Sequence, residues 1–373
     1  MIRIQIAWMF RGLPAALLLG AAFFGEPCMR SAPSAGTAAP KAVEPGDLEE
    51  RIDGFLTQAA DSGFNGSVLV EVEGRIVLHK GYGYADRKRT VPVTTTTPFW
   101  IASISKQFAA AAILELQEQG RLGLDDSIAS FFPGVPADKR GITLHQLLTH
   151  TAGLEQRYAA DGITDRDEAV RDLLAHPLVR PPGAAFGYSN DAYNLVAAVV
   201  EIVAAQAFET FVHERLLEPA GLAHTGFWGP KAHTEVAAIL QGDFPDSTIL
   251  EPNWGYRGAV GMFATSEDLY LWYQALASNR VLSPSSRDRL LTPHTQRGTV
   301  GVGYGWFVSS TPRGTKSVWT RGYEGFGHGA VLATYPDEGV VIVVTTNSGE
   351  QAPGVPVSHK LAEDLAQLVF TPR

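Results

Sequence analysis

A serine and a lysine lie three positions apart, at Ser103 and Lys106, where an alanine-rich, helix-forming segment begins. Side chains three positions apart share one face of a helix, so this hydroxyl and this amine can meet. A lysine in an apolar setting loses its charge more readily, and its neutral amine can then accept the serine proton. The same spacing also fits a helix-capping serine followed by a lysine that reaches solvent. The spacing alone is therefore weak evidence for a nucleophile and its base.

A second polar group, Tyr188-Ser189-Asn190, follows a loop rich in proline and glycine and precedes an apolar helical segment. A phenol near an ammonium group can pass protons between a nucleophile and a leaving group, and an amide side chain can orient a substrate carbonyl. The tripeptide can also be interpreted as a capping loop in which Asn190 starts the next helix. Together the two motifs favour nucleophilic catalysis, with Ser103 as the nucleophile and Lys106 and Tyr188 as its proton-handling partners.

The elements that must position these residues are strands at both ends of the chain and helices between them. Alternating β-branched residues around tight turns predict two hairpins, at residues 67–79 and 331–346. Helices are predicted at residues 47–62, 107–119, 192–205 and 357–370. We expect an α/β (α+β) fold in which both chain ends share one antiparallel sheet flanked by helices. The middle, about residues 106–295, is expected to be a mostly helical insertion.

Several longer stretches, in their order along the chain, resemble the serine β-lactamase-related family. That family includes class C β-lactamases, D-Ala-D-Ala carboxypeptidases, D-aminopeptidases and certain esterases. The resemblance covers nearly everything from about residue 50 onward, and its matching stretches are residues 99–106, 142–154, 186–190, 216–222 and 261–269. It implies a β-lactamase/transpeptidase-like fold with Ser103 as nucleophile and Lys106 as its activating partner. It also implies Tyr188 as general base or acid and Asn190 as a substrate contact.

A third cleft element, often Lys-Thr-Gly, is expected by this resemblance on the strand before the last hairpin. The chain has no Lys-Thr-Gly there, and residues 319–329 have the sequence WTRGYEGFGHG instead. Arg321 can anchor a carboxylate through a bidentate pair. That role follows from an alignment without gaps, which puts Arg321 at the cationic position. A second alignment puts residues 319–321 at the Lys-Thr-Gly position, and a third uses residues 323–325 with 327–328 and looks like the esterase branch. His328 either hydrogen-bonds the leaving group or simply belongs to the strand. Arg321 and His328 are therefore predicted substrate contacts, and the substrate class stays open.

The remaining histidines do not predict a metal site. His145 and His150 fall in the leucine- and histidine-containing stretch of the resemblance and are interpreted as helix-packing or capping residues. No histidines cluster with acidic residues at zinc-like spacing, so neither a metal nor another cofactor is predicted. A Gly-x-Ser-x-Gly elbow is also absent, which disfavours the α/β-hydrolase arrangement of the same chemistry.

Residues 1–40 have the composition of a signal peptide and linker, which leaves residues 41–373 as the hydrolase domain. Arg3 and Arg11 precede an apolar run, Leu13 to Phe24, that is too short to span a bilayer comfortably. We therefore expect an exported protein, periplasmic or extracellular, with no stable membrane span in its mature form. An uncleaved anchor and lipidation of Cys28, the single cysteine, are the less favoured alternatives.

The charge composition argues against nucleic acid as a partner. A formal net charge of -9 and a pI near 5.6 give no basic footprint for nucleic acid. We predict a serine hydrolase that forms a covalent acyl-enzyme with small ester, amide or peptide substrates, while its oligomeric state stays open. The alternatives are a non-catalytic penicillin-binding-like protein that binds a ligand or acts in signalling, and a true β-lactamase. The non-catalytic alternative is disfavoured because a binding protein does not need all of Ser103, Lys106, Tyr188 and Asn190.

Overall fold

The computed structural model describes residues 45–228, 253–324 and 327–371. The predicted signal peptide and linker, including Cys28, lie outside the described residues, as do two residues of the predicted third cleft element, 325 and 326. The localisation of the protein therefore stays a prediction.

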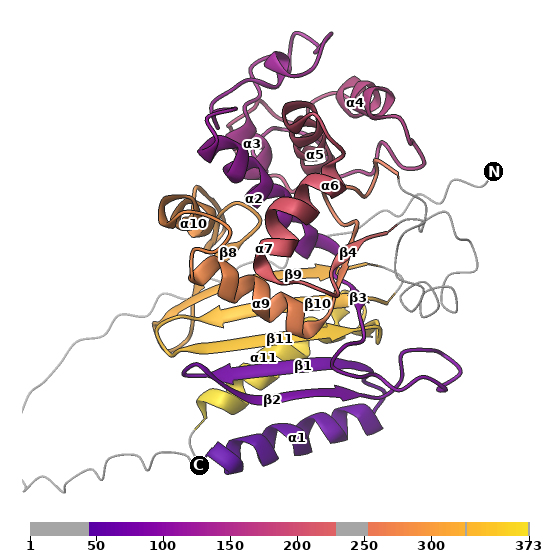
Figure 1. The fold of residues 1–373 in the computed structure, drawn as a ribbon, viewed down its shortest axis with the longest axis vertical. Helices are drawn as coiled ribbons and strands as arrows, with labels where there is room; N and C mark the ends of the chain where they lie inside the picture. The colour runs from indigo at the N-terminus through magenta and orange to yellow at the C-terminus, as the bar shows by residue number, and fades with distance from the viewer. Residues whose placement is uncertain (1–44, 229–252, 325–326, 372–373) are drawn as a thin grey trace, which may run out of the picture. The chain divides into compact units, whose positions relative to one another are not determined.

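An eight-stranded sheet joins the two ends of the described chain, in the order β2-β1-β11-β10-β9-β8-β7-β6 (Figure 1). Its strands are β1 (Gly66–Val72), β2 (Arg75–Tyr82), β6 (Thr295–Arg297), β7 (Val300–Val302), β8 (Phe307–Ser310), β9 (Lys316–Tyr323), β10 (Gly329–Tyr335) and β11 (Val340–Thr346). β1 and β11 run antiparallel from Gly66 opposite Thr346 to Val72 opposite Val340. Both predicted hairpins and the sharing of one antiparallel sheet are thus confirmed.

Hydrophobic cores lie on both faces of the sheet. On one face, α1 (Pro45–Asp61) and α11 (Val357–Phe370) pack their apolar stripes against alternate strand residues. On the other face, α9 (Ser266–Ala277) and the helices α2 (Ser105–Glu118) and α5 (Asn190–Ala204) belong to a larger core with the intervening strand residues. Strand side chains point alternately to the two faces, so one strand supplies both cores.

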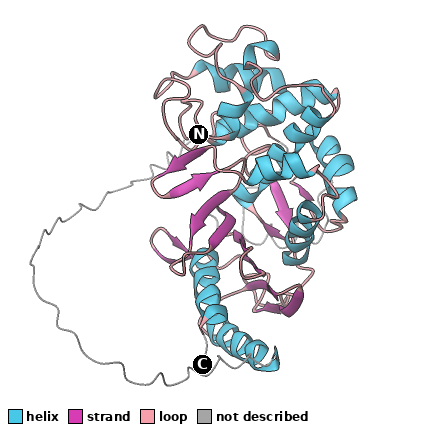
Figure 2. Cartoon of the chain, turned by 90° about the vertical axis from the view of Figure 1, so that its left-hand side faces the viewer, coloured by secondary structure: helices cyan, strands magenta, loops and turns pink. Residues whose placement is uncertain are grey.

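The helical part lies between β3 and β6 in the chain, and Figure 2 shows its helices gathered beside the strands. Its shorter helices and turns are η1 (Ala102–Ile104), η2 (Ile128–Ser130), α3 (Leu144–Leu148), α4 (Arg166–Ala175), α6 (Phe208–Val212), η3 (His213–Leu217), α7 (Glu218–Ala220) and α10 (Pro284–Leu291). A small sheet of order β3-β5-β4 is formed by β3 (Phe99–Trp100), β4 (Gly226–Phe227) and β5 (Met262–Ala264), and β12 (Glu350–Ala352) pairs with β13 (Val355–Pro356).

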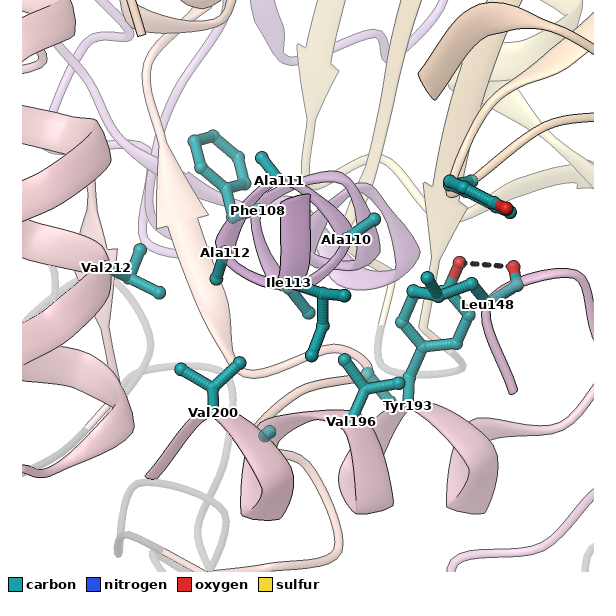
Figure 3. Packing of buried hydrophobic residues seen from close by; sticks show 14 of the residues in the cluster. Phe108, Ala110, Ala111, Ala112, Ile113, Leu148, Tyr193, Val196, Val200 and Val212 are labelled. Atoms are coloured by element: carbon teal, nitrogen blue, oxygen red, sulfur yellow. Dashed lines mark hydrogen bonds between the residues drawn. The ribbon is translucent and has the colours of Figure 1, made fainter. Parts of the chain in front are cut away.

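The central helix α2 is buried on nearly all sides, because its alanines allow neighbouring helices to approach closely. Figure 3 shows Val196 and Val200 of α5 facing α2 near Ile113. In the same core, the hydroxyl of Tyr193 donates to the backbone oxygen of Leu148 at 2.8 Å, which ties α5 to α3. The three helices that approach the motifs are therefore held as one packed group.

The described residues contain neither a single helix suited to span a membrane nor a cluster of metal-binding side chains. No single helix among them is both long and apolar enough to cross a membrane, although α5 followed by residues Phe208–Ala220 reaches the required length and composition with a bend of 80°. No group of three or more His, Cys, Asp or Glu side chains in the same ranges has an arrangement that could hold a metal ion.

Candidate active site

The candidate nucleophile, Ser103, lies in the short turn η1 immediately before α2. The preceding residue, Ala102, has a φ of 46°, in the left-handed region that residues with a Cβ rarely adopt. Ser103 does not cap α2, since the N-cap residue is Ile104 and no side chain there accepts a helix N–H. The capping interpretation of Ser103 is therefore wrong, and its hydroxyl meets other partners.

Lys106 lies in the first turn of α2 with 2% of its surface exposed, so it does not reach solvent. Its Nζ donates to Ser103 Oγ at 3.2 Å, to Asn190 Oδ1 at 2.7 Å and to the Ala259 backbone oxygen at 2.9 Å. Burial lowers the pKa of Lys106 to about 7, against an opposing effect of the Glu324 carboxylate. The amine is therefore divided between its charged and neutral forms near neutral pH.

Tyr188 lies on the loop before α5, and its hydroxyl donates to Ser103 Oγ at 2.7 Å. The Lys106 Nζ lies 4.8 Å from the centre of the Tyr188 ring, which is a cation–π distance. Burial raises the pKa of Tyr188 above its ordinary value, so the phenol is neutral at physiological pH. Ser103 is thus contacted by a neutral phenol and by an amine that can be neutral.

His150 holds the loop that carries Tyr188. Its ring stacks on the Tyr188 ring with centroids 4.3 Å apart, and its Nδ1 accepts from the Ser189 N–H at 3.1 Å. Its backbone oxygen accepts from the Gly187 N–H at 2.8 Å. Burial lowers the pKa of His150 well below its ordinary value, so the ring is neutral. The sequence indicates that His150 is a packing residue but does not predict that it packs against Tyr188.

Ser189 and Asn190 begin α5. The Ser189 hydroxyl caps the helix, and Asn190 is its first residue, with 2% of its surface exposed. The Asn190 side chain faces Lys106 through the hydrogen bond at Oδ1. The capping and the site interpretations of this tripeptide therefore hold together. The structure brings four of the predicted residues into one hydrogen-bonded group: Ser103, Lys106, Tyr188 and Asn190.

Gly322 of β9 lies against the turn that carries Ser103. A Cβ atom at this position would lie 2.1 Å from the Ile101 oxygen and 2.7 Å from the Ser103 nitrogen, so only glycine allows the approach. Thr320 shares this face of β9, because side chains two residues apart point the same way. This face of β9 is therefore the wall of the site beside Ser103.

The backbone of β9 places a second N–H group, that of Tyr323, beside the N–H group of Ser103. Glu324 N donates to the His328 oxygen across the turn to β10 at 3.0 Å. N–H groups alternate in direction along an antiparallel strand, so the Tyr323 N–H points away from β10. β8 pairs with β9 only as far as Trp319, which leaves that edge of Tyr323 facing η1. We infer that the N–H groups of Ser103 and Tyr323 point toward one oxyanion position.

Arg321 lies on the other face of β9 from Thr320 and Gly322, and it is exposed. Its guanidinium lies over the Trp319 ring, 4.8 Å from the ring centre. Among the contacts of the described residues, it is not part of the hydrogen-bonded group around Ser103. Its role as a carboxylate anchor stays a prediction.

His328 lies immediately before β10 with 1% of its surface exposed. Its ring centre is 6.5 Å from that of Phe99 on β3. Burial lowers the pKa of His328 to about 4, so the imidazole is neutral. This enclosed placement favours the interpretation of His328 as a packed strand residue over a contact with the leaving group.

Glu324 was not assigned from the sequence, although the alternative alignment of residues 323–328 includes it. It follows the last residue of β9, and the Tyr158 hydroxyl donates to its Oε1 at 3.0 Å. Burial raises the pKa of Glu324 to about 7, while the Tyr158 hydrogen bond and the charge of Lys106 act in the lowering direction. An acidic group thus lies within electrostatic reach of Lys106.

The sequence as a whole matches a known family over the region that forms this site. The family described as Beta-lactamase has a sequence model that matches residues 52–367. The chain belongs to the beta-lactamase family. The matched region contains Ser103, Lys106, Tyr188 and Asn190, and it extends from α1 into α11. The resemblance stated from the motifs is thus confirmed, and membership supports a serine hydrolase-like function.

This beta-lactamase family member is 28% identical over 261 residues to the "Putative penicillin-binding protein PbpX" of Bacillus subtilis (strain 168). The match covers 69% of the chain and 65% of that relative, so the chain spans just under two thirds of the relative's length. In structure, the chain is similar to a D-amino acid amidase from Ochrobactrum anthropi SV3, with 21% identity, a TM-score of 0.73 and coverage of 88% and 100%. It is also similar to EstCE1, described as a hydrolase with promiscuous acyltransferase activity, with 22% identity, a TM-score of 0.69 and coverage of 88% and 100%. Both structures confirm the fold.

Proposed function

We propose that the protein is a serine hydrolase that forms a covalent acyl-enzyme on Ser103. The observation that carries the proposal is the contact of Ser103 Oγ with Lys106 Nζ at 3.2 Å and with the Tyr188 hydroxyl at 2.7 Å. A hydroxyl with a proton acceptor and a proton relay within hydrogen-bond distance is the arrangement that nucleophilic catalysis requires.

The surroundings of Lys106 orient it as a base. A neutral amine has two N–H donors and one lone pair, whereas an ammonium group has three donors. The two shorter hydrogen bonds go to Asn190 Oδ1 and the Ala259 oxygen, which only accept. The remaining direction, toward Ser103 Oγ, is left for the lone pair. Neutral Lys106 can therefore receive the Ser103 proton while its two N–H groups stay hydrogen-bonded.

In the proposed reaction, Ser103 Oγ bonds to the carbonyl carbon of an ester or amide while its proton passes to Lys106. The carbonyl oxygen becomes an oxyanion that accepts from the N–H groups of Ser103 and Tyr323. The bond to the leaving group then breaks, and that group takes the proton by way of Tyr188. Water attacks the acyl carbon next, gives its proton back along the same path, and releases the acid from Ser103.

We infer that esters and amides are better substrates than β-lactams. On the face of β9 beside Ser103, Thr320 offers no cation to a β-lactam carboxylate. Glu324 lies further along the same face, and its ionised form repels an anion. An uncharged ester needs no such anchor, so its orientation is not impaired. A β-lactam that acylates Ser103 is expected to be released slowly and to act as an inhibitor.

The test combines covalent labelling with kinetics on one preparation. A fluorophosphonate probe is expected to label the wild type stoichiometrically and Ser103→Ala not at all, while Ser130→Ala, which alters an exposed serine, keeps its label. Values of kcat/KM are then compared for p-nitrophenyl butyrate, D-amino-acid amides and a chromogenic cephalosporin. We expect the highest value for an ester or an amide.

Three results would contradict the proposal. Turnover retained in Ser103→Ala would rule out Ser103 as the nucleophile. Absence of both labelling and turnover in a folded wild type would favour the non-catalytic ligand-binding alternative. A cephalosporin value about tenfold or more above the others would restore the true β-lactamase alternative.

A further inference from the structure

Glu324 is the acidic side chain nearest in the chain to the inferred oxyanion position. Thr320, Gly322 and Glu324 occupy every second position, so they project toward the same side, the side on which Gly322 meets the Ser103 nitrogen. The intervening residue, Tyr323, is the one whose N–H points toward η1. A carbonyl carbon bound at Ser103 would therefore lie close to the Glu324 carboxyl group.

An aromatic side chain binds this carboxyl group, and further rings pack behind it. Tyr158 donates its hydroxyl to Glu324 Oε1 at 3.0 Å, and its ring packs against Tyr256 with centroids 5.4 Å apart. The Tyr256 ring in turn packs edge-on against Trp100, at 6.2 Å. A carboxylate beside aromatic side chains can attract an organic cation. The chemistry of this end of the site is therefore that of an ammonium-binding site.

The charge balance before the reaction also favours a cation here. Lys106 is the basic group whose charge acts on Glu324. Lys106 must be neutral before it accepts the proton of Ser103, so until the transfer an ionised Glu324 lacks the compensating charge of Lys106. A substrate ammonium group beside Glu324 would supply that charge. It would also disfavour the protonated form of Lys106 by like-charge repulsion and so favour the free base.

We propose that Glu324, oriented by Tyr158, binds the α-ammonium group of an amino-acid ester or amide whose carbonyl carbon is attacked by Ser103. The inference rests on the proposed hydrolase function and names its substrate class. In such a substrate the nitrogen is two bonds from the carbonyl carbon, so it stays close to the oxyanion position, and Glu324 directly follows the inferred oxyanion donor Tyr323. The bonds made and broken are those of the acyl-enzyme reaction given above.

The test uses two substrates that differ only in the amino group: phenylalanine methyl ester, as the faster enantiomer, and methyl 3-phenylpropanoate. The readout is the ratio of their kcat/KM values in the purified full-length protein. Glu324→Gln keeps the shape of the side chain and removes its charge, and it is expected to lower this ratio about 10- to 100-fold, mainly through KM for the amino ester. Tyr158→Phe is expected to lower the ratio by a smaller factor, in the same direction.

Glu50→Gln is the matched control, because Glu50 is an exposed carboxylate on α1, which packs on the face of the sheet opposite α2. The ratio should not change in this variant. Equal losses for both esters in Glu324→Gln, or no loss for either, would overturn the ammonium site while leaving the hydrolase in place. Absence of Ser103-dependent turnover of both esters in the wild type would instead contradict the proposed function, and this inference with it.

Discussion

Replacing Lys106 with methionine removes the buried amine and keeps an unbranched side chain of similar length. The variant should lose hydrolysis, because the base is gone, and yet be more stable than the wild type at neutral pH. The reason is that burial moves the pKa of Lys106 from its ordinary value of 10.5 to about 7 in the folded protein. Below pH 7 the folded protein therefore carries a buried charge that the unfolded chain holds in water.

The magnitude follows from that difference in pKa. At about 1.36 kcal/mol per pH unit, holding the charged amine in the folded protein costs about 5 kcal/mol below pH 7. Methionine removes this cost but leaves Asn190 Oδ1 and the Ala259 oxygen without their donor, at about 1 to 2 kcal/mol each. The net gain in the free energy of unfolding is about 2 kcal/mol at or below pH 7.

The sign of the pH dependence is fixed by proton uptake. Between pH 7 and 10.5 the unfolded lysine binds a proton that the folded lysine does not, so wild-type stability rises with pH by about 1.36 kcal/mol per unit. The advantage of Lys106→Met should therefore shrink by about 3 kcal/mol between pH 7 and 9.5 and change sign. In the variant the pKa of Glu324 loses the lowering effect of the Lys106 charge, which shifts the comparison in the same direction.

Urea unfolding of both proteins at several pH values between 6.5 and 9.5 measures this difference. The same pair of measurements in a Glu324→Gln background isolates the contribution of Lys106. Lys316→Met, at the exposed start of β9, should show no comparable change with pH. A stability difference between Lys106→Met and wild type that stays within about 1 kcal/mol over this range would refute the argument that Lys106 is a desolvated amine.

Three further predictions concern activity. For an uncharged ester, kcat/KM should rise with pH through an apparent pKa near 7 and fall about tenfold per pH unit below it, because neutral Lys106 is required. Glu324→Gln should move the midpoint of the pH–rate profile to lower pH, because the Glu324 carboxylate raises the pKa of Lys106. A midpoint that moves to higher pH would contradict this coupling between Glu324 and Lys106. Gly322→Ala should reduce the rate of labelling by a fluorophosphonate at least about a hundredfold, because a Cβ atom 2.1 Å from the Ile101 oxygen forces β9 away from Ser103. Normal labelling would show that β9 does not approach Ser103 this closely. His150→Asn tolerates the φ of 58° but removes the buried ring under Tyr188. Steady-state kinetics should show a loss of about tenfold in kcat, and thermal stability should also fall because the lost ring leaves a cavity. An unchanged kcat would mean that Tyr188 does not need this support.

The fold was predictable from sequence because its strands and end helices carry clear periodic patterns. The predicted terminal helix, residues 357–370, matches α11, and both predicted hairpins are present. The group around Ser103 could also be predicted, since Ser103 and Lys106 lie within one turn, and Tyr188 and Asn190 lie two residues apart where the loop meets α5. Such short spacings can be interpreted without knowledge of the tertiary structure.

The other side of the site depends on contacts between residues far apart in the chain. Residues 319–329 contain four glycines, so no apolar alternation shows which side chains face the cleft. Only the pairing of β9 with β10 separates the face of Gly322 from that of Arg321. Likewise, the hydrogen bond between Tyr158 and Glu324 and the stacking of His150 on Tyr188 join separate segments and leave no local pattern.

The order of the sheet also determines when in its synthesis the protein can become active. Ser103 is made early, but β9, which provides the Tyr323 N–H, is held in place by β10 and β11, and β11 pairs with β1 from the other end of the chain. A growing chain that lacks these late strands has its serine without the second inferred oxyanion donor. Such long-range pairing is also slow to form. Incomplete chains should therefore lack hydrolase activity, and activity should begin only after the last strands of the sheet have been synthesised.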